Sequence, residues 1–134
     1  MEDREIRQRV SRLRQERRLV EEHCLSIGEQ MGLWVSQRYT RCGKAGCKCM
    51  RGEGHGPFWY GSYKEGGRLT CRYLGAERLK KIRHAVENYR VFQERMARLH
   101  KIHQEVTGLL KAHQRAHWVR IPGWVRAKKG KAGR

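Results

Sequence analysis

Two long stretches of this chain carry apolar residues at every third or fourth position, and this repeat constrains the fold more than any other feature. The first stretch covers residues 2–31, where Arg17 is the single interruption of a heptad a/d stripe. The second begins after Gly75 and continues to about residue 117. We expect two long amphipathic helices, at about 2–31 and 76–117, packed as an antiparallel, coiled-coil-like hairpin. The first stripe consists of Ile6, Val10, Leu13, Val20, Cys24, Ile27 and Met31.

The segment between these helices has the pattern of a small β-hairpin. Residues 57–64 and 68–74 are rich in aromatic and branched side chains, and Gly66-Gly67 between them allows the positive φ angles of a type I′ turn. The predicted register places Tyr60 opposite Tyr73, Ser62 opposite Cys71 and Lys64 opposite Leu69. The fold class is therefore mainly α with a small β insert, in which a two-stranded hairpin forms the head of the helical hairpin.

The chain length of 134 residues fits one modest domain. We predict a single domain over residues 1–117, with a Cys/His loop and the β-hairpin at about 38–74. Residues 118–134 hold six basic and no acidic side chains. We expect this segment to be a basic tail that is partly disordered, from about residue 126 onward.

Three cysteines and a histidine lie directly ahead of the hairpin with the spacing Cys-x4-Cys-x-Cys-x5-His. Thiolates and imidazole nitrogens are the ligands that Zn²⁺ prefers, and four protein ligands make a closed, structural site. The N-terminal residues lack the apolar core of a signal peptide. We therefore expect a reducing, cytoplasmic setting, where clustered cysteines favour metal over disulfides. The predicted zinc ligands are Cys42, Cys47, Cys49 and His55, with Cys71 as the substitute if His55 points away.

The charge balance indicates a polyanionic partner. The chain has 31 Lys and Arg against 13 Asp and Glu, a net charge of +18. Residues 1–31 are neutral overall, whereas residues 32–75, 76–117 and 118–134 each contribute +6. The excess of positive charge therefore begins at the cysteine segment and continues to residue 134.

Basic and aromatic side chains alternate on one face of the predicted hairpin, and further basic residues surround the cysteines. Aromatic rings can stack on bases while Arg and Lys bind phosphates, so this pattern is typical of a nucleic-acid-binding surface. The other hairpin face, with Phe58, Tyr60 and Tyr73, is expected to pack against the helices or the metal loop. The predicted nucleic-acid contacts are Arg38, Arg41, Lys44, Lys48, Arg51, Trp59, Tyr63, Arg68 and Arg72.

Other classes of protein lack support in the sequence. No apolar run approaches the roughly 18 residues of a membrane span. No acidic pair, Ser-His-Asp set or phosphate-binding glycine loop is evident, so we do not expect an enzyme. His113 and His117 are one helical turn apart, but no HExxH arrangement accompanies them, and we expect solvated or half-buried histidines.

The string Cys42-Gly43-Lys44-x-x-Cys47-x-Cys49, followed by Gly54-His55-Gly56-Pro57, resembles an uncharacterised prokaryotic family known only as a domain of unknown function. The resemblance covers about residues 33–100 and includes the triplet Glu87-Asn88-Tyr89. Members of that family often accompany mobile-element genes. The resemblance implies DNA rather than RNA as the partner, and a role accessory to mobile-element processes, but it implies no reaction.

The leading interpretation is a DNA-binding protein that uses a zinc-stabilised basic and aromatic hairpin. The alternative is an oligomeric adaptor, in which the heptad helices form a coiled coil between chains. A homodimer of this kind would dock a protein partner, such as a transposase, through its zinc head.

Overall fold

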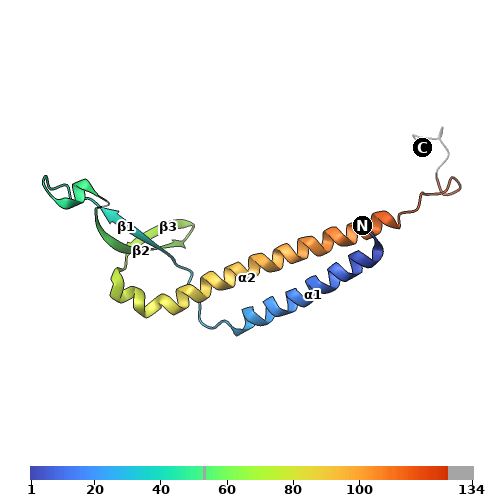
Figure 1. Cartoon of the computed structure of the whole chain (residues 1–134), viewed down its shortest axis with the longest axis horizontal. Helices are drawn as coiled ribbons and strands as arrows, with labels where there is room; N and C mark the ends of the chain where they lie inside the picture. The colour runs from blue at the N-terminus through green and yellow to red at the C-terminus, as the bar shows by residue number, and fades with distance from the viewer. Residues whose placement is uncertain (53, 127–134) are drawn as a thin grey trace. The chain divides into compact units, whose positions relative to one another are not determined.

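The computed structural model describes residues 1–52 and 54–126, without the side chains of Cys49 and Met50. Figure 1 shows the order of the elements along the chain. The prediction of a disordered tail falls almost entirely on residues outside this described part. The fold is mainly α with a β insert, as predicted. The elements are α1 (Asp3–Ser26), β1 (Trp34–Thr40), the short 3-10 helix η1 (Lys48–Arg51), β2 (His55–Glu65), β3 (Arg68–Tyr73) and α2 (Gly75–Ala116).

The described residues divide into two compact units. Unit 1 combines residues 1–18 with residues from His100 to 126, and unit 2 falls within residues 19–99. Helices α1 and α2 each contribute residues to both units.

Unit 1 is a two-helix pair in which apolar residues of both helices are buried. Ile6 and Leu13 of α1 are buried, as are Ile102 and Leu109 of α2, and Ile102 has no exposed surface. These residues recur at helical spacing on each element, which is the pattern that buries one face of an amphipathic helix.

In unit 2, helix α1 ends at Ser26 rather than near residue 31, so the predicted boundary was five residues too long. The Met31 amide donates to the Ala85 carbonyl at 3.0 Å, and the Asn88 side-chain amide donates to the Glu29 carbonyl at 2.9 Å. Gly28 lowers helix propensity in this segment. The backbone amide of Met31 and the backbone carbonyl of Glu29 are therefore paired with residues of α2, and helix α1 does not continue through this segment.

The sheet has three antiparallel strands in the order β1-β2-β3, so the prediction of a two-stranded insert was wrong by one strand. The predicted hairpin register is confirmed, with Tyr60 opposite Tyr73 and Ser62 opposite Cys71. Gly66 and Gly67 have φ angles of +57° and +79°, as a type I′ turn requires. Strand β1 was not predicted from the sequence, because it is a largely exposed edge strand whose residues do not alternate regularly between apolar and polar.

The two faces of the sheet have different surroundings. By register, Val35, Trp59 and Gly61 share one face. Val35 and Trp59 line a cavity with residues of α2, among them Leu79, and the Leu33 side chain lies against the Gly61 backbone. Residues of this face therefore lie near α2. The other face also approaches α2 through Trp34, which lies opposite Ser62 and whose ring centroid is 6.0 Å from that of Tyr89.

None of the helices within residues 1–52 and 54–126 combines the length and apolar character needed to cross a membrane.

Candidate metal centre and basic surface

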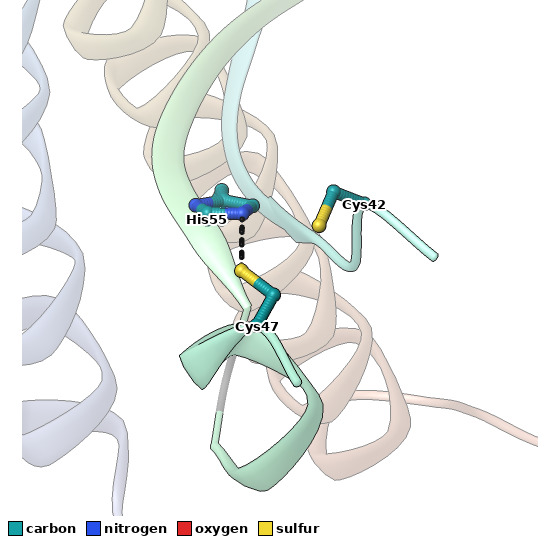
Figure 2. Close-up of side chains that lie close together, drawn as sticks. All are labelled: Cys42, Cys47 and His55. Atoms are coloured by element: carbon teal, nitrogen blue, oxygen red, sulfur yellow. Dashed lines mark hydrogen bonds between the residues drawn. The ribbon is translucent and has the colours of Figure 1, made fainter. Parts of the chain in front are cut away.

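Three of the four predicted zinc ligands converge at one end of the sheet. Cys42 follows strand β1, Cys47 lies in the turn before η1, and His55 is the first residue of β2. Figure 2 shows the three side chains approaching one another from these separate segments. Residues up to 13 positions apart in the sequence are thus brought together by the return of the chain from β1 to β2.

The donor atoms of Cys42, Cys47 and His55 all lie within 4.8 Å of one another. The Cys47 Sγ and His55 Nε2 atoms are 3.3 Å apart (Figure 2). Ligands of a tetrahedral zinc ion with Zn–S of about 2.3 Å and Zn–N of about 2.0 Å are separated by roughly 3.5–3.8 Å. The two thiols and the imidazole can therefore hold a metal ion after small side-chain movements.

Two glycines place His55 against strand β1. Gly54 and Gly56 have φ angles of +100° and +133°, a region that L-residues with a Cβ rarely adopt. A Cβ on Gly54 would lie 2.7 Å from the Thr40 carbonyl oxygen, and one on Gly56 would lie 2.8 Å from that of Arg38. The Gly-His-Gly sequence thus lets the backbone around His55 approach the end of β1 closely.

Within the described part of the loop between Cys42 and His55, two hydrogen bonds to backbone carbonyls tie the chain to itself. The Cys47 amide donates to the Lys44 carbonyl at 3.2 Å, and the Arg41 guanidinium donates to the Gly52 carbonyl at 3.4 Å. Cys42 and His55 are exposed and Cys47 is half-buried. Because so little apolar surface is buried here, a metal ion would supply much of the order of this loop.

The other two candidate ligands, Cys49 and Cys71, are not among the three residues that converge. Cys49 belongs to η1, but its side chain lies outside the described part of the structure. Cys71 is absent from the cluster, and its Sγ accepts a hydrogen bond from the Arg38 guanidinium at 3.2 Å. The position of Cys71 on β3 therefore gives it a partner other than the Cys/His loop.

The predicted basic contacts are exposed, and most of them surround the Cys/His loop. Arg38 differs from the others because its guanidinium lies over the Tyr60 ring, 4.7 Å from the centroid, besides contacting Cys71. On strand β3, both arginines are exposed. The exposed basic residues of the loop are Arg41, Lys44, Lys48 and Arg51.

The aromatic residues are arranged differently from the prediction. Trp59 and Tyr63 are half-buried, and Trp59 lines the cavity next to α2. On the opposite face, Tyr73 is 55% exposed. Tyr73 meets Tyr60 and Phe58 edge-on, with ring centroids 5.7 and 6.3 Å away. Phe58 and Tyr60 are half-buried like Trp59 and Tyr63, so Tyr73 is the exposed ring among these five aromatic residues.

Sequence reasoning also missed the structural role of the triplet Glu87-Asn88-Tyr89. Asn88 bonds the segment after α1, and Tyr89 meets Trp34 edge-on at 6.0 Å between ring centroids. Glu87 pairs with Arg90, and this hydrogen bond to the guanidinium holds the pKa of the Glu87 carboxyl below its usual value. The helical period alone does not reveal these roles, because all three positions are ordinary for a helix.

Comparison with known proteins places the chain in a family but gives it no described relative. Neither a curated protein nor a solved structure matches it. A family model described as a domain of unknown function, DUF6788, matches residues 2–84. The match begins well before the residues expected from the motifs and ends before the triplet at 87–89. Since it includes α1, the Cys/His loop and the whole sheet, and more than half of the sequence, the chain belongs to the DUF6788 family.

Proposed function

We propose that this protein is a non-enzymatic nucleic-acid-binding protein that acts on DNA. One observation carries the proposal: exposed basic side chains surround a loop whose cysteines and histidine converge like metal ligands. Such a loop would present several positive charges in a fixed arrangement, which suits a regularly spaced polyphosphate. The resemblance seen in the sequence motifs implies an association with mobile-element genes, which favours DNA over RNA.

Zinc has a structural role in this proposal. Cys42, Cys47 and His55 would supply three ligands and Cys49 the fourth, which leaves no open position for water or substrate. The ion would hold the loop against β1, where Gly54 and Gly56 already place His55. Thiolate ligation of this kind is consistent with the reducing cytoplasm that the sequence favours.

The surface of the sheet would add contacts beside the loop. Arg68 and Arg72 are exposed on β3, and the face with Phe58, Tyr60 and Tyr73 offers aromatic rings near Arg38. Trp59 and Tyr63 are half-buried, as are Phe58 and Tyr60. This distribution supports phosphate contacts from the loop and from β3, with stacking assigned to the partly exposed rings on both faces.

The test compares two triple variants that remove the same charge from different places. Lys44→Ala/Lys48→Ala/Arg51→Ala removes three positive charges from the loop. Arg4→Ala/Arg9→Ala/Arg12→Ala removes three exposed charges from α1, where the sequence is neutral overall. Binding to duplex DNA, single-stranded DNA and RNA is measured by fluorescence anisotropy across a range of salt concentrations.

If about six phosphates are neutralised, the wild-type slope of log K against log salt is about −5, and the loop variant loses about 3 of it. The α1 variant is expected to keep the wild-type slope. Arg68→Ala/Arg72→Ala is expected to weaken binding severalfold with the fold intact. Equal slopes for the wild type and the loop variant would reject the loop as the binding surface, and tighter binding to RNA would reject DNA as the partner.

The alternative, an oligomeric adaptor, is favoured by one feature of α1. Leu19 and Leu25 are 63% and 87% exposed, and they could meet another chain. However, Ile6, Leu13 and Val20 of the heptad stripe are already buried within the single chain. Sedimentation decides between the two proposals: a stable dimer that is indifferent to DNA supports an adaptor for a transposase-like protein.

A further inference from the structure

A second group of potential metal ligands lies in unit 1, far along the sequence from the Cys/His loop. Asp3 of α1, His113 of α2 and His117 just after α2 have donor atoms that all lie within 4.8 Å of one another. The His113 Nδ1 and Asp3 Oδ1 atoms are 2.5 Å apart. The two imidazole rings are 4.2 Å apart between centroids. All three residues belong to the same compact unit.

The hydrogen bonds around this group orient its members as metal ligands are usually oriented. The His117 Nδ1 atom is 2.9 Å from the His113 carbonyl oxygen, to which it donates as the protonated nitrogen. This fixes the tautomer and leaves the His117 Nε2 lone pair available. Ligating histidines in proteins commonly donate their second ring nitrogen to a backbone carbonyl or a carboxylate in this way.

The carboxylate is held by a neighbouring arginine. The Arg7 Nε atom donates to Asp3 Oδ2 at 3.0 Å, while Oδ1 faces His113. The hydrogen bond from Arg7, followed by the contact with His113, holds the pKa of the Asp3 carboxyl below its usual value. One carboxylate oxygen of Asp3 is therefore positioned by Arg7, and the other faces His113.

We propose that Asp3, His113 and His117 bind a divalent first-row transition metal ion such as Zn²⁺. Two imidazoles and a carboxylate form a borderline donor set that suits Zn²⁺, Co²⁺ and Ni²⁺ rather than Mg²⁺ or Ca²⁺. Because Asp3 begins α1 and the histidines lie at the end of α2, the ion fastens the first turn of one helix to the last turns of the other. Its fourth position is open to water, since three protein ligands are available.

This site is independent of the Cys/His loop. It uses nitrogen and oxygen donors only, and two of its three ligands lie beyond residues 2–84, the part that the family model matches. His113 is half-buried and His117 is exposed, as expected from the sequence, and the proposal adds a role as metal ligands for both. The missing signal was Asp3, which lies 110 residues away and is brought near by the pairing of the two helices.

The experiment uses the full-length chain without an affinity tag, because a polyhistidine tag would compete for the same ions. Metal-free protein is titrated with Zn²⁺ by calorimetry and with Co²⁺ by absorption spectroscopy. The variants are His117→Ala, which leaves the Asp3–His113 contact in place, and Asp3→Asn, which keeps the side-chain shape. His103→Gln, an exposed histidine of α2 outside the cluster, is the matched control.

We expect the wild type to bind one equivalent of Co²⁺ that shows no thiolate-to-metal charge-transfer band, in addition to any equivalent at the cysteines. His117→Ala and Asp3→Asn should each weaken this equivalent by at least about 10–100-fold, the range seen when even the outer-shell partner of a metal ligand is changed. His103→Gln should leave it unchanged. Three results would overturn the proposal: a wild-type metal affinity in both His117→Ala and Asp3→Asn, a loss of metal affinity in His103→Gln, or thiolate absorption from every bound equivalent of Co²⁺.

Discussion

At the residue scale, glycines decide where the candidate ligands lie. Gly54 and Gly56 flank His55 and bring its backbone against β1 at distances that leave no room for a Cβ. The sequence singled out Gly54-His55-Gly56 as part of a motif, and the structure shows why its glycines are needed: their backbones lie too close to β1 for a Cβ. The Cys and His residues identify the chemistry, and the glycines beside them determine the geometry.

Replacing Gly54 with alanine tests this role directly. We expect Gly54→Ala to lower the affinity for Zn²⁺ by at least about tenfold, because strain of about 1–3 kcal/mol at a positive φ opposes the ordered loop that the metal needs. Gly52→Ala is the matched control, since Gly52 has a φ of −144° and nothing within 4 Å of an added Cβ. Competition with a chromogenic chelator measures both affinities. Equal affinities in the two variants would contradict the role assigned to Gly54.

At the element scale, the periodicity of the sequence predicted the elements that depend on local sequence. It did not predict the elements whose presence or ends depend on contacts with distant segments. Helix α2 and the β2–β3 register followed from apolar spacing and from Gly66-Gly67, and the structure has both. The end of α1 and the presence of β1 depend on partners that lie elsewhere in the chain, on α2 and β2. The surroundings of the two sheet faces did not follow from the hairpin pattern, because both faces carry aromatic rings and both have residues near α2.

Asn88 provides a test of the contacts that end α1. Its side chain donates to the Glu29 carbonyl, close to the bond between the Met31 amide and Ala85. Asn88→Ala should destabilise this segment by about 1 kcal/mol, the usual net value of one hydrogen bond. Hydrogen exchange followed by NMR should then show faster exchange at the Met31 amide.

Gln104→Ala is the comparison for this measurement, because Gln104 is an exposed residue of α2 that belongs to unit 1. It should leave exchange at Met31 unchanged. If Asn88→Ala also leaves that exchange unchanged, the segment after α1 is held by contacts other than the Glu29–Asn88 bond.

At the scale of the whole molecule, the uneven distribution of charge links the metal to the proposed partner. Residues 1–31 carry no net charge, whereas every later part of the chain carries an excess of positive charge. Nucleic-acid affinity from this excess is of two kinds. Positive charges along α2 and beyond are present whether or not metal is bound, whereas in our proposal those of the Cys/His loop gain fixed positions when an ion holds the loop.

Metal removal should therefore reduce DNA binding only in part. We expect chelator-treated protein to retain a salt-dependent affinity, with a slope of log K against log salt that is smaller by about 3, since Lys44, Lys48 and Arg51 lose their fixed positions. Adding Zn²⁺ back should restore the slope in the wild type but not in a Cys42→Ser/Cys47→Ser variant. His117→Ala should respond to chelator as the wild type does, because its metal ligand lies outside the proposed DNA surface. An unchanged slope after metal removal would mean that charge alone, without a metal-ordered loop, accounts for binding.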